Sequence, residues 1–310
     1  MSIELLRMEN VRKTYRRAGK EIVALSDFSM ALHAGEVLGL LGPNGAGKTT
    51  AIKALVSLVE ADSGIMRWRG QPVRGKGYLR EVGVLLEGRG ALNERLSTWE
   101  NANYFCRLRE GIFDPLHFDN MARLLALPDV HAPVRLLSTG NKLRSGLLLS
   151  LIHKPAVVFL DEPTIGLDLF GVQMLEELVR HVAAMGTAVM ISSHDLQFVE
   201  RLAQRIVCIC RGRKVFDGSK SDFLHVEHAY VLSLQTGEDA PSLLPQLRGA
   251  SNWRAGGPGV QRLQLHNHAE LCAVLESLMP SLPSVRGIQI ERVTLKEKYM
   301  ALVDEAEQAA

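Results

Sequence analysis

Nine consecutive residues, 42–50, have the types and the spacing that bind a polyphosphate. They fit the pattern G-x-x-x-x-G-K-[ST], with two glycines, a lysine and a threonine in register. The glycines let successive backbone N–H groups turn toward one anion, and a following helix adds the positive end of its dipole. Lys48 would reach the β- and γ-phosphates, and the Thr49 hydroxyl would ligate Mg²⁺. We expect the whole segment to contact a nucleotide: Gly42, Pro43, Asn44, Gly45, Ala46, Gly47, Lys48, Thr49 and Thr50.

The flanking residues distinguish this loop from a glycine-rich turn that matches by chance. An apolar run before it, residues 37–41, predicts a buried strand, and residues 51–56 predict the start of a helix. A dinucleotide-binding loop does not fit, because the glycine spacing differs and a lysine stands where such a site has none. The context therefore favours a phosphate-binding loop between a strand and a helix.

Two adjacent carboxylates follow a second apolar run, residues 156–160. Asp161 and Glu162 would repel each other at the end of a buried strand unless a cation or a reaction uses their charge. Beside a phosphate loop, Asp161 suits Mg²⁺, directly or through water, and Glu162 suits a general base that faces an attacking water. Adjacent strand residues point in opposite directions, so the two can take different tasks. A purely structural pair is the alternative.

Polar residues end two further apolar runs. Glu87 follows residues 82–86, and His194 follows residues 188–191 after two serines. Ligands of open α/β sheets bind at the carboxyl ends of the strands. This location suits His194 for a contact with the γ-phosphate and Glu87 for a contact with magnesium or water. A structural histidine and a solvated loop carboxylate are the alternatives.

Three other residues have two interpretations each. Ser138 is a candidate N-cap just before an expected helix, residues 143–152, and its segment is either a second anion site or an ordinary capped helix. Asp168 is a candidate cap of another helix. Tyr15 ends an alternating stretch and either stacks on a nucleotide base or packs against a sheet. The residues alone leave these alternatives open.

These side chains need a scaffold that brings several strand ends together. Strands that alternate with helices predict an α/β fold with a mostly parallel sheet and its ligand at the carboxyl edge. Residues 3–15 and 22–30 alternate with period two and predict a pair of strands joined by a basic loop. Residues 98–127 predict helices, and we place a helical subdomain at about residues 90–150.

Composition sets the broad class. The 310 residues can form two domains, and 36 basic against 34 acidic residues give a net charge of +2, which shows no nucleic-acid-binding stripe. The four cysteines, Cys106, Cys208, Cys210 and Cys272, lack metal-ligand spacing and favour buried free thiols in a reducing compartment. No secretory segment or run of ~20 apolar residues is present, so we expect a cytoplasmic protein that reaches a membrane only through a partner.

The order of these motifs resembles the ATP-binding subunit of ABC transporters over residues 3–224. Residues 42–50 resemble that family's Walker A motif and residues 157–161 its Walker B motif, with metal ligands expected at Thr49, Asp161 and Glu87. The resemblance makes Glu162 the catalytic glutamate, His194 the switch histidine and Asp168 part of the D-loop. It also makes Tyr15 the aromatic that stacks on adenine, Glu87 the equivalent of the Q-loop glutamine, and Ser138, Thr139, Gly140 and Asn141 the signature that acts on a partner's nucleotide.

The resemblance implies the P-loop ABC ATPase fold, with a mostly parallel core sheet, an antiparallel β subdomain and a helical subdomain. It implies ATP and Mg²⁺ as cofactors and a translocase subunit that hydrolyses ATP at two composite sites of a head-to-tail dimer. The dimer is a homodimer or a pair of related subunits, located on the cytoplasmic face of the cell membrane. It would drive export through separate transmembrane permease subunits, as in exporters of drugs, polysaccharides, lipids or ions.

Three departures from the family pattern leave other functions open. Glu87 stands in place of glutamine, Thr139 in place of glycine, and Asn141 in place of glutamine. These changes would suit a slow ATPase or a nucleotide switch with negligible turnover. A soluble cassette ATPase that acts on nucleic acid or ribosomes is a further alternative, which the near-zero net charge disfavours.

The segment 225–310 predicts a second, accessory or regulatory domain. Its strands and helices follow the order β-α-β-β-α-β, a ferredoxin-like α+β arrangement. The helices are expected at residues 241–247, 268–279 and 294–303. No polar constellation there suggests catalysis, so we expect a dimerisation, regulatory or permease-docking module.

Overall fold

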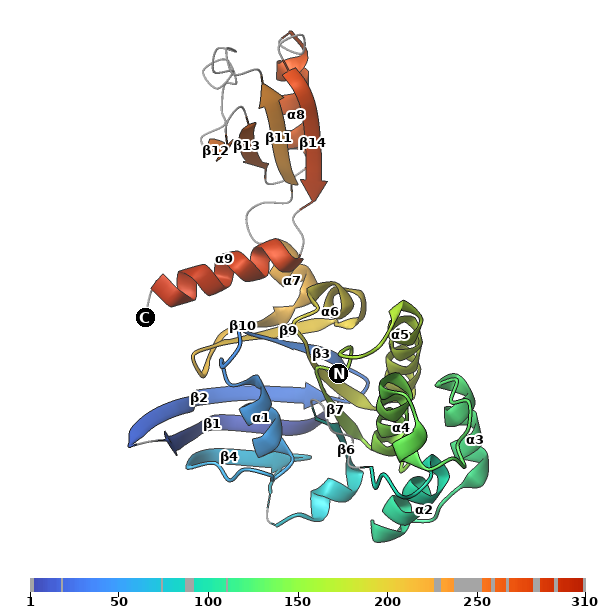
Figure 1. Cartoon of the computed structure of the whole chain (residues 1–310). Helices are drawn as coiled ribbons and strands as arrows, with labels where there is room; N and C mark the ends of the chain where they lie inside the picture. Colours follow the sequence, from blue (N-terminus) through green and yellow to red (C-terminus); the bar gives the residue numbers. More distant parts are fainter. Residues whose placement is uncertain are drawn as a thin grey trace. The chain divides into compact units, whose positions relative to one another are not determined.

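Internal contacts divide the chain into two compact units (Figure 1). The computed structural model describes residues 3–17, 19–73, 75–86, 92–109, 111–225, 230–236, 253–257, 260–265, 268–280, 285–292 and 295–308. One unit comprises residues 1–220 with 303–310, and the other residues 221–302. The sequence pattern placed residues 303–310 in the second domain; the difference arises because the last helix, α9 (Leu295–Gln308), spans the division.

A six-stranded sheet forms the centre of the first unit, in the order β10-β9-β3-β8-β7-β6. Its neighbours pair in parallel, except that β10 runs antiparallel to β9 at one edge. Strands β3, β7 and β8 are buried along their whole length, as continuous apolar runs allow in a sheet covered on both faces. The predicted mostly parallel sheet is therefore confirmed. The bounds are β3 Val37–Leu41, β6 Val82–Leu85, β7 Val157–Asp161, β8 Ala188–Ser192, β9 Arg205–Cys210 and β10 Arg213–Ser219.

A second, antiparallel sheet has the order β2-β1-β4-β5. Its long hairpin continues to the pair Arg17 and Lys20, so most of the predicted basic loop is strand. The exposed ion pair of Arg16 with Glu21, 3.2 Å apart, lies across this extension, and opposite charges favour such cross-strand pairing. The bounds are β1 Glu4–Arg17, β2 Lys20–His33, β4 Ser63–Trp68 and β5 Gln71–Pro72.

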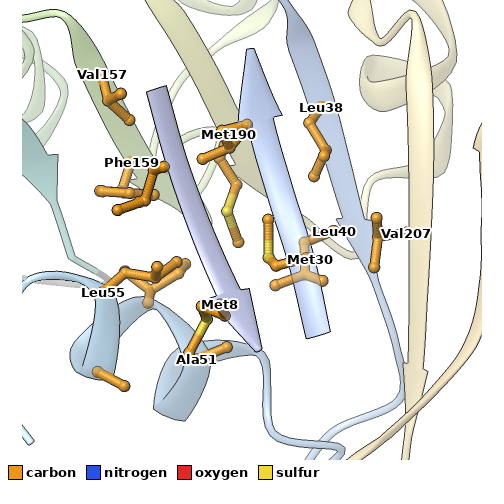
Figure 2. Packing of buried hydrophobic residues seen from close by; sticks show 14 of the residues in the cluster. Met8, Met30, Leu38, Leu40, Ala51, Leu55, Val157, Phe159, Met190 and Val207 are labelled. Atoms are coloured by element: carbon orange, nitrogen blue, oxygen red, sulfur yellow. The ribbon is translucent and has the colours of Figure 1, made fainter. Parts of the chain in front are cut away.

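One hydrophobic cluster joins the two sheets with helix α1 (Lys48–Leu55). It contains Met8 and Met30 of the antiparallel sheet, Leu40 and Phe159 of the parallel sheet, and Leu55 of the helix. Figure 2 shows side chains from these elements gathered in this cluster. Because α1 is buried along one face, the loop that precedes it is held at a fixed place on the sheet.

Three helices lie between β6 and β7 in the chain and gather beside the core sheet (Figure 1). The first begins with a reciprocal capping box between Ser97 and Glu100, and the second begins at Pro115 with Asp114 as its cap. The third begins at Thr139, four residues before its predicted start, because Ser138 already accepts a hydrogen bond there from the Asn141 N–H. The bounds are α2 Thr98–Leu108, α3 Pro115–Leu124 and α4 Thr139–Leu151, with short 3₁₀ turns η1 Gly77–Glu81 and η2 Val134–Leu136.

The remaining helices of the chain's middle are α5 (Leu169–Ala184), α6 (Leu196–Leu202) and α7 (Lys220–His225). Helix α5 connects β7 to β8, as expected for a parallel sheet. Among the described residues, no helix is both long and apolar enough to cross a bilayer.

The cysteines are free thiols in different surroundings. Cys106 on α2 and both Cys208 and Cys210 on β9 are buried, whereas Cys272 on α8 is exposed. Burial raises the pKa of Cys208 to about 12. The expectation of buried thiols thus holds for three of the four.

The second unit contains a four-stranded antiparallel sheet in the order β12-β13-β11-β14. The connection from β11 to β12 skips β13, and the connection from β13 to β14 skips β11, which is the predicted split βαβ arrangement. Helix α8 contributes Leu271 and Leu278 to a small core with leucines of the sheet. The helix predicted at residues 241–247 lies outside the described residues. The bounds are β11 Tyr230–Thr236, β12 Trp253–Gly257, β13 Val260–Leu265, α8 His268–Leu278 and β14 Val285–Arg292.

Candidate active site

The loop after β3 is shaped by its glycines. Gly45 and Gly47 have φ of 78° and 114°, in the left-handed region that side chains disfavour. A Cβ on Gly42 would lie 2.4 Å from the Ile209 carbonyl oxygen, and one on Gly47 would lie 2.4 Å from the Ala24 carbonyl oxygen. The backbone can therefore follow this path only with glycine at positions 42 and 47, whereas at position 45 a Cβ would meet no atom within 4 Å.

The loop leads into the N-terminus of α1. Gly47 is the N-cap and has no side chain to accept from the first N–H groups of the helix. The first residues of the helix, Lys48, Thr49 and Thr50, line the cleft, where an anion can accept from their N–H groups and is favoured by the helix dipole. The geometry is that of a phosphate cradle.

Lys48 is largely buried beside this cradle. Its ammonium donates to the carbonyl oxygens of Gly42, at 2.6 Å, and Pro43, at 3.2 Å. An anion that enters the loop would compete with these two neutral carbonyl acceptors for the Lys48 ammonium. It would be the stronger acceptor, because a hydrogen bond between two charged groups is stronger than one to a neutral acceptor.

A cleft of about 490 Å³ opens above the loop. Glu162 and His194 line it together with the phosphate loop. They meet there because β3 pairs with β8 and β8 with β7, so the three loops that follow these parallel strands leave the sheet at one edge. Residues 43–50 all line this cleft.

Asp161 ends β7 as a buried carboxylate, 1% exposed. The Ser192 hydroxyl, opposite it in the register of β7 and β8, donates to its Oδ1 atom. Its Oδ2 atom is buried without a hydrogen-bond partner among the described residues. An unsatisfied buried carboxylate oxygen is expensive, so the site favours a cation at this position.

Glu162 turns away from the strand direction, with φ of 51°. Its backbone N–H donates to the Ser192 carbonyl at 2.8 Å, which holds this left-handed conformation. Its Oε2 atom lies 2.7 Å from His194 Nδ1 and accepts from the His194 backbone N–H at 3.2 Å and the Ser193 hydroxyl at 3.4 Å. The side chains of Asp161 and Glu162 therefore take different directions because β7 ends between them, and not because they alternate along one strand. Strain held at such a position is typical of functional sites.

The signature segment lies apart from this cleft. Ser138 caps α4, with its hydroxyl accepting from the Asn141 N–H at 3.2 Å. A Cβ on Gly140 would lie 3.6 Å from the Gly166 carbonyl, and Thr139 also adjoins Gly166, so the segment borders the turn before α5. None of residues 138–141 lines the cleft of the same chain.

Asp168 is a helix cap, as predicted. Its Oδ1 atom accepts from the Gly171 N–H at 2.7 Å and lies 3.7 Å from an Arg144 guanidinium nitrogen on α4. This ion pair joins the start of α5 to the signature helix.

Tyr15 is 37% exposed, with the Lys13 ammonium 5.6 Å from its ring centroid. It pairs across the hairpin with Ile22, which lines the cleft, but Tyr15 itself is not a lining residue. Its stacking on adenine stays a prediction. Glu87 lies outside the described residues.

The sequence reasoning missed several residues of this site. Ile22, Ala24 and Ile165 line the cleft, and the hydroxyls of Ser192 and Ser193 hold the two carboxylates. The pair of serines directly before His194 was the available signal. The apolar lining residues left none, because their position depends on how the two sheets pack.

A phosphate cradle, strand-end carboxylates and a histidine at one sheet edge define a nucleotide-binding protein of the P-loop class. Comparisons with known proteins specify the family. Residues 25–165 match the family model described as ABC transporter. An uncharacterised ABC transporter ATP-binding protein, YhcH of Bacillus subtilis (strain 168), is 29% identical over 310 residues, covering 98% of this chain and 97% of that protein.

Two relatives with named cargo are also similar. The lantibiotic transport ATP-binding protein SrtF of Streptococcus pyogenes is 35% identical over 225 residues, covering 70% of this chain and 93% of that protein. Nod factor export ATP-binding protein I of Ralstonia nicotianae is 32% identical over 252 residues, covering 78% of this chain and 75% of that protein. A dimeric ATP-binding cassette solved with ADP and Pi superposes with a TM-score of 0.62 at 20% identity, covering 69% of this chain and 98% of that one.

The chain belongs to the ATP-binding proteins of the ABC transporter family. Its fold is that of the ABC ATPase cassette, and its family membership implies ATP binding and hydrolysis.

Proposed function

We propose that this chain hydrolyses ATP at two composite sites of a head-to-tail pair and thereby drives export through a separate membrane permease. The observation that carries this proposal is the single cleft in which the phosphate loop, Glu162 and His194 meet. The buried Asp161 beside them, with one oxygen unpaired among the described residues, supports a cation-dependent phosphoryl reaction.

In this proposal the loop amides and Lys48 bind the β- and γ-phosphates. Glu162 accepts the proton of the water that attacks the γ-phosphorus, while the bond from that phosphorus to the β–γ bridging oxygen breaks. His194 holds Glu162 in place through the 2.7 Å contact and contacts the γ-phosphate. The hydroxyls of Ser192 and Ser193 position the two carboxylates.

The residues present fit a magnesium ion. Asp161 offers an unpaired carboxylate oxygen, and the Thr49 hydroxyl lines the cleft. Bound there, Mg²⁺ would neutralise charge on the phosphates. Among the described residues, no group of three or more histidine, cysteine, aspartate or glutamate side chains could hold a metal.

The composite site is supported by where the signature lies. Ser138 and Gly140 do not line the cleft of their own chain, so the capped start of α4 is available to the nucleotide of a second copy or of a related subunit. A dimer occurs in the structural neighbour solved with ADP and Pi. Export through a permease is supported by relatives named for lantibiotic transport and Nod factor export.

The variant Glu162→Gln tests the proposal. It should lower ATP turnover by roughly 10²–10⁴, the contribution of a general base, and should leave a stable ATP-bound dimer in light scattering. Glu177→Gln, which changes an exposed carboxylate on α5, is the matched control and should behave as wild type. A monomer at saturating ATP would contradict the composite site.

Phosphate release separates this function from a nucleotide switch, which Glu87 and Asn141 would also suit. Wild type should release phosphate faster than Lys48→Ala, which lacks the ammonium that binds the phosphates. Equal rates with retained ATP binding would instead favour the switch.

A further inference from the structure

A second pocket lies at the opposite edge of the core sheet. It has a volume of about 750 Å³, larger than the nucleotide cleft. Pro155 and Ala156, just before β7, and Gly186 and Thr187, just before β8, line it, so it opens at the amino ends of the strands. Strands of five residues at ~3.3 Å per residue separate the two edges by about 16 Å. The pocket is therefore distinct from the ATP site.

The inner wall of this pocket is apolar. Met121 of α3, Leu151 of α4 and Val182 of α5 are buried side chains that line it. Leu124 and Met185 extend the same surface outward. A volume between roughly 300 and 1,000 Å³, mostly apolar walls and a few polar groups are the usual properties of a small-molecule site.

Basic and polar groups gather on one side of the pocket. His117, Lys154 and His181 all line it. The pKa of His117 is lowered by burial first and then by the positive charge of Lys154; the Asp114 carboxylate opposes this shift, and His181 adds a smaller lowering effect. These groups therefore lie within electrostatic reach of His117. Among the described residues, the Lys154 ammonium forms an ion pair with Asp114 at 3.5 Å, and the lysine side chain is 60% exposed.

One polar atom in this group lacks a partner. His117 Nε2 is buried without a hydrogen bond among the described residues. Its backbone N–H is used by the α3 cap, so only the ring remains for a ligand. A buried polar atom that is left unpaired is unfavourable, and a ligand that pairs with it would recover that loss.

The other charged groups of the pocket do not offer a second anion site. The Arg69 guanidinium pairs with the Glu81 carboxylate at the pocket margin, which neutralises both. The groups that remain next to the apolar wall are the Lys154 ammonium, which pairs with Asp114 at 3.5 Å, and the imidazole rings of His117 and His181.

We propose that this pocket binds a small amphipathic monocarboxylate, with its alkyl or aryl body on Met121, Leu151 and Val182 and its carboxylate between Lys154 and His117. A carboxylate accepts from both the ammonium and the ring N–H, while the body covers apolar surface. This site goes beyond the proposed function and does not depend on it.

Methionine-methyl NMR of the full-length protein, without nucleotide, tests the proposal. Octanoate, titrated to about 2 mM, should shift the methyl signals of Met121 and Met185 saturably, since millimolar affinity needs only ~4 kcal/mol. Met8 and Met190, buried elsewhere in the core, should not shift and report that each variant is folded. The neutral analogue 1-octanol should bind at least tenfold more weakly.

Two variants sharpen this test. Lys154→Met should weaken octanoate binding about tenfold, a loss of ~1.4 kcal/mol, and leave octanol unchanged. Leu124→Trp should fill the pocket and abolish binding of both. Three results would overturn the proposal: no saturable shift at Met121 and Met185, equal binding of octanol and octanoate, or shifts spread equally over all methionines.

Discussion

The two edges of the core sheet carry cavities that are built in different ways. At the carboxyl edge, the nucleotide cleft depends on backbone conformation: Gly45, Gly47 and Glu162 have positive φ, and all three line the cleft. At the amino edge, the second pocket is formed by side chains such as Met121 and His117, from segments between residues 69 and 187.

This difference has a physical cause. A polyanion is best bound by many oriented N–H groups, which a short continuous loop supplies. An apolar body is best bound by side-chain surface, which any packed elements can supply. The first kind of site therefore leaves a contiguous motif in the chain, and the second does not.

The largest effect is expected from adding one methyl group to the cleft. Gly47→Ala should destabilise the protein by roughly 3–5 kcal/mol and abolish ATP retention, because the new Cβ overlaps the Ala24 carbonyl at a φ of 114°. Gly45→Ala is the control: it has φ of 78° but nothing within 4 Å, and should lose only about 1–2 kcal/mol. Urea unfolding measures both. Equal losses would show that close backbone approach does not define the cleft.

The next largest effect is a pH dependence of folding stability that comes from His153, at the amino edge of the sheet. His153 follows α4 in the chain between Leu151 and Lys154, which line the second pocket, and its Nε2 atom lies 3.1 Å from the Val82 carbonyl oxygen. Burial, with a contribution from Arg109, lowers its pKa to about 4. The unfolded chain then binds a proton between about pH 6.5 and 4 that the folded chain does not, so stability falls as the pH drops through this window.

The expected loss is about 3 kcal/mol at pH 4, from a shift of ~2.5 units. Unfolding midpoints of wild type and His153→Gln between pH 7 and 4 measure it. The variant should be less stable at pH 7 and should have a flatter profile. If the unfolding midpoints of wild type and His153→Gln fall equally with pH, groups other than His153 cause the loss of stability in acid.

The smallest stability effect comes from helix α4, which carries Ser138 at one end and pocket-lining Leu151 at the other. Ser138→Ala should lose about 1 kcal/mol, because the Asn141 N–H loses its acceptor. Ser97→Ala, which removes the comparable cap of α2, should lose a similar amount. If Ser138 acts on a partner's nucleotide, only Ser138→Ala should also lose ATP-dependent pairing in light scattering. Equal pairing in both variants would leave Ser138 as a cap alone.

The sequence predicts the cleft far better than the pocket. The strand before Gly42, the helix after Lys48 and the end of the apolar run at Asp161 are local patterns, so the parallel sheet and its polar edge follow from them. The left-handed conformation of Glu162 and the bond of Ser192 to Asp161 depend on the pairing of β7 with β8, which joins residues about 30 apart in the chain.

The start of α4 was placed too late although a local signal existed. Ser138 was a candidate N-cap, but the apolar periodicity begins only at Leu143, so the first turn from Thr139 was not assigned to the helix. The strand order of the second unit was implied by the predicted split βαβ pattern, and the pairing of β11 with both β13 and β14 agrees with it. His117 and Met185, by contrast, carry no local signal, since they line one pocket only when α3 and the end of α5 come together in the folded chain.

The placement of the thiols gives the molecule built-in reporters. Cys208 and Cys210 lie inside the core sheet and Cys106 inside the helical segment, whereas Cys272 faces solvent on α8. A maleimide dye on the folded wild-type chain should therefore label the second unit at one position without any mutation. The rate at which the three buried thiols are alkylated in the same sample would then measure how often the first unit opens enough to expose them.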